Sequence, residues 1–329
     1  MSLLAPLLER FFTDRLMRER QASPNTITAY RDGFRLLLRF AKERLGKAPS
    51  DLHLGDLDAP LVGAFLDHIE KQRKNSARTR NARLAVIHSF FRYVALLEPA
   101  HSGMIQRVLA IPTKRCNRAL VTYLARPEVD AILVAPDRQT WIGRRDHALM
   151  QTGIQTGLRV SELTRLRCQD AHIEGGAHVQ CLGKGRKQRC VPLSPQTVAI
   201  LRAWLRERRG DPSDPLFPTR VGAALSRDAV ERLLDKYASR AGHACASLRG
   251  KRVSPHVLRH TSAMNLLQGG ADCAVIALWL GHESIETTQM YLHADLSIKE
   301  RALARTAPPN TRPGRYRAPD ALVSFLEAL

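Results

Sequence analysis

Residues 254–260 read SPHVLRH, and this stretch carries the clearest structural signal in the chain. Ser254 is a good N-cap, and Pro255 fits the first position of a helix. His256 and Arg259 then stand three residues apart on one helix face, near the helix N-terminus. Backbone N–H groups and the helix dipole favour an anion there, and an imidazole with a guanidinium would complete a phosphate pocket. Alternatively, His256 and Arg259 could be a helix cap and a surface charge that bind no phosphate.

A second stretch holds residues that could take part in a reaction. It covers residues 278–295 and reads LWLGHESIETTQMYLHAD. A short apolar helix would stop at Gly281 and leave His282 in a turn. Ser284 can cap the next helix, which would carry Tyr291. A lone tyrosine on such a helix is more often packed than reactive, so its position alone leaves both roles open.

Two more stretches lie upstream of these. Residues 155–163, QTGLRVSEL, place Arg159 near the start of a helix after a break at Gly157, where a structural ion pair is the alternative role. Residues 178–193, HVQCLGKGRKQRCVPL, alternate apolar and polar side chains around a Gly-Lys-Gly-Arg-Lys centre, which predicts a β-hairpin. The hairpin tip would present three basic side chains: Lys184, Arg186 and Lys187.

The first hundred residues predict a helical unit, because apolar residues recur at helical spacing in four segments. The fourth segment opens with Arg78, Arg80 and Arg83 close together. In a basic chain we expect these three to contact phosphates, with a solvated helix face as the alternative.

Residues 98–119 are polar and basic and contain two prolines, so they predict a linker between a small helical domain and a larger one. We therefore divide the chain into a domain over residues 1–108, a second domain over 115–305 and a tail over 306–329. Both sides of the linker carry excess positive charge, as a two-part clamp around a duplex would.

Charge indicates the class of partner. The 329 residues include 51 lysines and arginines against 31 aspartates and glutamates, a formal net charge of +20. Such an excess repels itself in a compact fold, and a polyanionic partner is the usual reason to keep it. Aromatic residues are only 5% of the chain, which argues against a single-strand binder that stacks bases.

Several other classes of protein are not expected. The apolar stretch from Leu3 to Leu8 is too short for a signal-peptide core, and no run approaches the roughly 18 apolar residues of a membrane span. The six cysteines are scattered without a C-x-x-C pair. That spacing predicts reduced thiols in a cytoplasmic protein and no zinc site.

The order of these motifs resembles the tyrosine recombinase (phage integrase) family. An arginine, a lysine on a hairpin, His-x-x-Arg, Gly-His and a tyrosine follow one another in that family's order, and the resemblance covers nearly the whole chain. In size and layout the chain is most similar to the compact Xer-type recombinases and the recombinase-type transposases. The resemblance implies a mainly α fold with a small β-sheet, in which a helical core-binding (SAM-like) domain and an α+β catalytic domain clamp DNA.

The resemblance also implies residue roles at the scissile phosphate. Tyr291 would attack it and leave a 3′-phosphotyrosyl DNA with a free 5′-hydroxyl. Arg159 and Arg259 would bind the non-bridging oxygens and neutralise the growing charge. His256 would assist proton transfer at the nucleophile, and His282 would donate a hydrogen bond to a phosphate oxygen.

Further roles follow from the same resemblance. Lys184 would protonate the departing 5′ oxygen, a choice that rests on the family's Gly-Lys-Gly pattern rather than on spacing. Arg186 and Lys187 beside it would bind DNA. Glu162 fits the family's acidic position as a support for Arg159. His260 is expected to pack or to bond locally.

The implied reaction needs neither metal nor nucleotide cofactor, because the two arginines do what Mg²⁺ does in two-metal nucleases. Two rounds of strand exchange through a Holliday junction would take place in a tetramer on two double-stranded DNA sites, away from any membrane. A second recombinase encoded nearby could take part.

The expected outcome is integration, excision or transposition of a mobile element, and the alternative is chromosome or plasmid dimer resolution by the same chemistry. Two other classes stay open. A type IB topoisomerase would relax one duplex without exchanging partners. A non-catalytic DNA-binding protein would be expected to lack at least one residue of the implied catalytic set.

The tail ends in ALVSFLEAL, which places four apolar side chains on one helical face: Leu322, Phe325, Leu326 and Leu329. Nine residues cannot hold a helix alone in water, so this face must dock on something. We expect it to dock on a neighbouring protomer, with docking on its own domain as the alternative.

Overall fold

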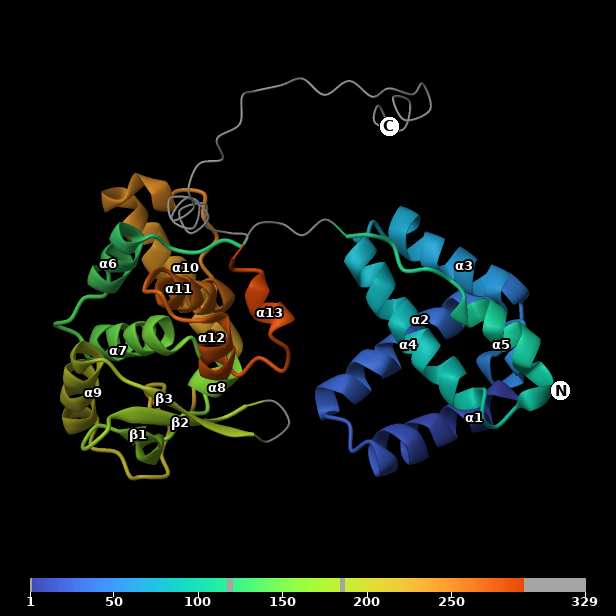
Figure 1. The fold of residues 1–329 in the computed structure, drawn as a ribbon, viewed down its shortest axis with the longest axis horizontal. Coiled ribbons are helices and arrows are strands. Elements are labelled where there is room, and N and C mark those ends of the chain that lie inside the picture. The colour runs from blue at the N-terminus through green and yellow to red at the C-terminus, as the bar shows by residue number, and fades with distance from the viewer. Residues whose placement is uncertain (1, 117–120, 184–186, 293–329) are drawn as a thin grey trace, which may run out of the picture. The chain divides into compact units, whose positions relative to one another are not determined.

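The computed structural model describes residues 2–116, 121–183 and 187–292 (Figure 1). Within these ranges the chain is mainly helical with one three-stranded sheet, as the sequence predicts. The chain divides into two compact units between residues 118 and 119. Across the described ranges, the helices include none with both the length and the apolar character that a membrane crossing requires.

The first unit is built from helices around an aromatic core. Phe11, Phe34 and Phe90 meet there with ring centroids 5.3 to 6.3 Å apart. Ser23 accepts a hydrogen bond from the backbone of Thr26 and so starts the second helix where the sequence predicts it. The elements are α1 (Leu4–Arg10), the π-helical η1 (Phe11–Glu19), α2 (Pro24–Leu45), η2 (Pro49–Asp51), η3 (Leu54–Asp56), α3 (Ala59–Asp67), the π-helical η4 (His68–Gln72), α4 (Ala77–Val94), η5 (Pro99–His101) and α5 (Ser102–Leu109).

The prediction of a linker over residues 98–119 is wrong for its first half. The short turn η5 and the helix α5 occupy that part, and α5 buries Ile105 and Val108 in the core of the first unit. The Val108 carbonyl also lies 3.1 Å from the His88 ring nitrogen Nε2. After α5, residues 111–116 form neither helix nor strand, and residue 116 is the last described residue of this segment. The exposed polar residues of α5 are Ser102, Gln106 and Arg107, so the helix is amphipathic and its outer side resembles a linker in sequence.

The second unit carries the sheet along one edge (Figure 1). Its strands pair antiparallel in the order β1-β2-β3, with His178 opposite Pro192 and Leu182 opposite Gln188, so the predicted hairpin is confirmed. The helix α7 is buried along nearly its whole length and packs against α9 and α11. The elements are α6 (Arg126–Val134), α7 (Trp141–Thr156), α8 (Val160–Leu163), η6 (Cys168–Asp170), β1 (Ala171–His172), β2 (His178–Leu182), β3 (Gln188–Pro192), α9 (Pro195–Arg208), α10 (Arg227–Ala244), η8 (Ala246–Leu248), α11 (Pro255–Gln268), α12 (Cys273–Leu280) and α13 (Glu286–Gln289).

Local capping sets the ends of the last three helices. Ser254 accepts a hydrogen bond from the backbone of Val257, so α11 begins as predicted. The helix α13 is shorter than predicted, because it ends at Gln289 and leaves Tyr291 in the turn that follows. Ser284 still accepts a hydrogen bond from the backbone of Glu286.

Candidate active site

The first candidate arginine is positioned by a glycine turn. The helix α7 ends at Gly157 with φ +62, a conformation that side chains rarely adopt. A Cβ atom there would also lie 2.6 Å from Leu280 Cδ2. The turn makes Arg159 the N-cap of α8, and its Nη2 donates to the Gly281 carbonyl at 2.8 Å.

The second candidate arginine reaches the same place from α11. Arg259 is buried, and it donates to the Gly157 carbonyl at 2.8 Å and to the Leu280 carbonyl at 2.7 Å. Burial and the nearby charge of Arg159 lower the pKa of Arg259 to about 10, so it stays charged at neutral pH. The structure thus brings both guanidinium groups to the end of α12, where their charges add.

A buried carboxylate balances these charges. Glu162 accepts hydrogen bonds from the Arg159 backbone at 2.8 Å and from Arg159 Nη1 at 2.9 Å, the contact expected of a supporting residue. Arg189 on β3 donates to both carboxylate oxygens of Glu162 and to the Trp279 carbonyl. Burial alone would raise the pKa of Glu162, but the hydrogen bonds from Arg189 and Arg159 outweigh it and hold that pKa below its ordinary value.

Sequence reasoning missed Arg189, although a signal was present. Side chains two apart on a strand share a face, so Arg189 points to the same side as the buried Val191. A charged residue on the inward face of a strand needs a buried partner.

His282 lies in the turn after α12, as predicted. Its Nδ1 atom shares a hydrogen bond of 2.8 Å with the hydroxyl of Thr288, which is buried on α13 and was not anticipated. Burial, with the charges of Arg259 and Arg159, lowers the pKa of His282 to about 4, so the ring is neutral at pH 7. With Nδ1 occupied by Thr288, Nε2 is left for another partner.

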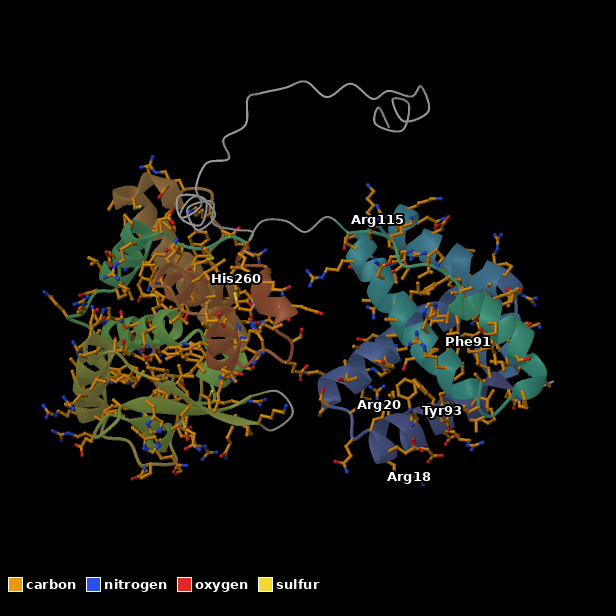
Figure 2. The ribbon with its side chains drawn as sticks, in the orientation of Figure 1. Arg18, Arg20, Phe91, Tyr93, Arg115 and His260 are labelled. Carbon is orange, nitrogen blue, oxygen red and sulfur yellow. The ribbon has the colours of Figure 1, made fainter. Side chains whose placement is uncertain are left out.

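The Tyr291 side chain is 1% exposed, and its hydroxyl lies 3.0 Å from Nδ1 of His260 in a hydrogen bond. Figure 2 shows His260 among the C-terminal helices of the second unit. His256 lies one turn earlier on α11, is exposed, and makes no hydrogen bond to Tyr291 in the described part of the chain. The structure therefore brings His260 to the tyrosine, where the sequence led us to expect His256.

The basic residues of α4 differ from one another. Arg78 is exposed, and Arg83 is partly exposed and donates to the Ala29 carbonyl at 3.2 Å. Arg80 is buried and donates to the Pro112 carbonyl at 2.9 Å, which fixes the chain that follows α5. The guanidinium of Arg80 is thus engaged inside the unit, which argues against the phosphate contact that we expected for it.

Most of the other residues that we expected at the site or in DNA binding lie outside the part of the chain that the structure describes. Lys187 is exposed next to β3. Lys184, Arg186 and the tail over 306–329 lie outside the described residues.

A basic groove of about 540 Å³ adjoins the N-terminus of α11. It was not anticipated from the sequence. Its lining includes four exposed basic side chains, Arg227, Arg232, Arg252 and His256, and two carboxylates, Glu231 and Asp235. Arg227 donates to Glu231 at 2.9 Å, so part of its charge is balanced within the groove. Within the described ranges, no three His, Cys, Asp or Glu side chains come together as metal ligands would.

Comparison with known proteins gives two family matches. Residues 122–297 match the phage integrase family, and residues 8–96 match the phage integrase N-terminal SAM-like domain. The chain is 56% identical to the putative integrase/recombinase y4rC of Sinorhizobium fredii, over 99% of this chain and 98% of that protein. It is 35% identical to the tyrosine recombinase XerC of Pelobacter propionicus, over 89% and 93%.

Two solved structures share the fold at low sequence identity. The XerH site-specific recombinase in a post-cleavage complex with its palindromic difH substrate is 22% identical with a TM-score of 0.67, over 87% of this chain and 81% of that one. The Tn1549 transposon integrase in complex with a circular intermediate DNA is 15% identical with a TM-score of 0.68, over 93% and 100%.

Proposed function

The chain belongs to the phage integrase family and is a tyrosine site-specific recombinase, and we propose that it cuts duplex DNA by forming a covalent bond to Tyr291. The tyrosine Oη would attack the phosphorus and expel the 5′ oxygen, which leaves a 3′-phosphotyrosyl link. A 5′-hydroxyl from a partner duplex would reverse the step and exchange strands. Two such rounds would pass through a Holliday junction.

The convergence of Arg159 and Arg259 supports this proposal best. Both guanidinium groups are aimed by main-chain oxygens of residues 157, 280 and 281, close to His282 and Tyr291. Each guanidinium has five N–H donors, so donors remain for the non-bridging oxygens of a phosphate. Fixed positive charge at that position stabilises the charge that develops as the phosphate is attacked.

We assign hydrogen bonding to the phosphate to His282 through its Nε2. Since the ring is neutral and Thr288 bonds to Nδ1, a proton on Nε2 would be held in one orientation. His256 is exposed at the start of α11, where we place it against the DNA backbone. Lys184, on the segment between β2 and β3, would protonate the leaving 5′ oxygen, a role that rests on the family resemblance.

The residues that we propose to contact DNA come partly from the sequence motifs and partly from the groove seen in the structure. Arg78 and Arg83 of the first unit, with Arg186 and Lys187 of the hairpin segment, would bind phosphates. The basic groove beside His256 adds three more side chains: Arg227, Arg232 and Arg252. The XerH and Tn1549 integrase structures contain DNA, which supports a double-stranded DNA partner for this chain.

A mobile element is the context that we propose, with assembly of four protomers on two DNA sites. The Tn1549 integrase acts in a transposon, and the y4rC and y4rD relatives, 56% and 40% identical to this chain, come from one strain. That pair supports a second recombinase as partner. The similarity to XerC and XerD favours dimer resolution as the second candidate.

The test uses a nicked suicide duplex that carries a site selected by binding from random sequences. The protein should form an SDS-resistant adduct, and Tyr291→Phe should abolish it while DNA binding stays. Tyr123→Phe, in the same apolar cluster, is the matched control and should keep the adduct. An adduct with the Tyr291 variant, or a need for Mg²⁺ in the cleavage step, would overturn the proposal.

A further inference from the structure

The hydroxyl of Tyr291 has one described partner, and it is His260. The Nδ1 and Oη atoms are 3.0 Å apart, and the two rings meet edge to face with centroids 5.6 Å apart. The rest of the Tyr291 ring packs on apolar side chains of α11 and α12 in a buried cluster that includes Met264 and Leu280. The contact is therefore a buried hydrogen bond at the edge of an apolar cluster, and burial strengthens it.

The two histidines of α11 face different surroundings. His256 and His260 lie one turn apart, with ring centroids 6.5 Å apart. His256 lines the open basic groove, while His260 is turned toward the tyrosine. Of the two, His260 is the one that forms a hydrogen bond with the Tyr291 hydroxyl among the described residues.

We propose that His260 accepts the proton of Tyr291 as Oη bonds to phosphorus, an inference that rests on the proposed function. In this step the Oη–P bond forms, the P–O5′ bond breaks, and the proton moves from Oη to Nδ1. The departing 5′ oxygen takes its proton from a different group, which we have assigned to Lys184. In the reverse reaction His260 returns the proton to Oη.

The electrostatics of the site support transfer during attack rather than before it. Burial, then His256 and Arg259, lower the pKa of His260 to about 4, so its ring is neutral and can accept at pH 7. Burial raises the pKa of Tyr291, although Arg259 acts against this. The phenol therefore keeps its proton until bond formation to phosphorus makes the oxygen acidic. The groups that face this pair are His256 and Arg259 on α11 and His282 in the turn after α12.

Two substitutions separate proton acceptance from mere positioning. His260→Asn keeps an acceptor close to the place of Nδ1 but cannot hold a proton at neutral pH, and His260→Ala removes both functions. Single-turnover adduct formation is measured on a substrate with sulfur at the bridging 5′ position, which needs no acid for its leaving group. We expect both variants to be slower by about 100-fold or more at pH 7, a typical loss for a general base. His243→Asn, an exposed histidine on α10, is the control and should match the wild type.

An Asn variant within a few-fold of the wild type would show that the bond only positions the tyrosine, and it would overturn the proposal. An Ala variant at the wild-type rate would do the same. Loss of the adduct in the wild type itself would instead sink the proposed function.

A measurement on the free protein tests the inference without any reaction. In ¹⁵N NMR of histidine-labelled protein, the resonance lost in His260→Asn identifies the ring. We expect its Nδ1 to be unprotonated at pH 7 and to shift in Tyr291→Phe, because the phenol donates to it. A protonated Nδ1 would make the ring the donor and overturn the proposal.

Discussion

The guanidinium of Arg189 holds both carboxylate oxygens of Glu162, at 3.0 and 2.8 Å. The same carboxylate accepts two hydrogen bonds from Arg159, so it lies between two positive groups. Arg189 belongs to β3 of the hairpin, whereas Arg159 begins α8. The hairpin and Arg159, for which we propose phosphate binding, are thus joined through one buried carboxylate.

Replacing Arg189 by Met should disturb this arrangement while keeping much of the side-chain volume. Glu162 would lose two of its hydrogen bonds, and breaking a buried pair costs about 3–5 kcal/mol. We expect a lower unfolding midpoint and slower adduct formation, with Arg189→Lys intermediate. Arg206→Met, exposed on α9, is the control. Wild-type stability and rate in Arg189→Met would show that Glu162 does not depend on it.

Thr288→Val should slow the reaction by releasing the His282 ring. Valine has nearly the shape of threonine but cannot bond to Nδ1, and a lost hydrogen bond of about 1.4 kcal/mol corresponds to a rate about tenfold lower. Thr288→Ser keeps the hydroxyl and should stay near the wild type. The measurement is the rate of adduct formation by the wild type and by each Thr288 variant. Equal rates for the Val and Ser variants would contradict a role for Thr288 in orienting His282.

Arg78 and Arg80 should respond differently to the same change. Arg78→Ala should weaken DNA binding and lower the slope of log affinity against log salt by about 1, as expected for one phosphate contact. Arg80→Ala should instead loosen the contact with residues 111–116, at a cost of about 2 kcal/mol. Salt titrations measure the first effect and hydrogen exchange of α4 measures the second. A reduced salt slope for Arg80→Ala would restore it as a DNA contact.

Acid should destabilise the second unit through its buried histidines. Burial, with the charge of Arg138, lowers the pKa of His147 to about 4, against about 6.5 in an unfolded chain. The unfolded state then binds more protons, so the free energy of unfolding falls as the pH drops from about 6.5 to about 4. Urea unfolding at pH 7 and pH 5, followed by Trp141 and Trp204 fluorescence, measures this. His147→Gln should lose less stability between the two pH values, and an equal loss would contradict the assignment.

Features encoded by neighbouring residues could be predicted from the sequence. The start of α11 at Ser254, its end at Gly269 and the hairpin around residues 183–187 depend on caps, glycines and alternation that a single stretch displays. The position of Arg159 after Gly157 is of the same kind. These elements are specified within a few residues.

The partners of the site residues could not be predicted in the same way. Arg189 meets Glu162 across 27 positions and His260 meets Tyr291 across 31, so no local pattern announces either contact. The helix α5 was missed for a different reason. Its eight residues bury few side chains, and their polar neighbours resemble a linker.

The peptide oxygens that hold Arg159 and Arg259 have a mechanical consequence. Two of the three belong to residues 280 and 281, where α12 ends and its dipole leaves partial negative charge. Any force on the chain just beyond Gly281 is therefore transmitted to both guanidinium groups at once. A displacement of the backbone at residues 280 and 281 would therefore shift the charged groups of Arg159 and Arg259 together.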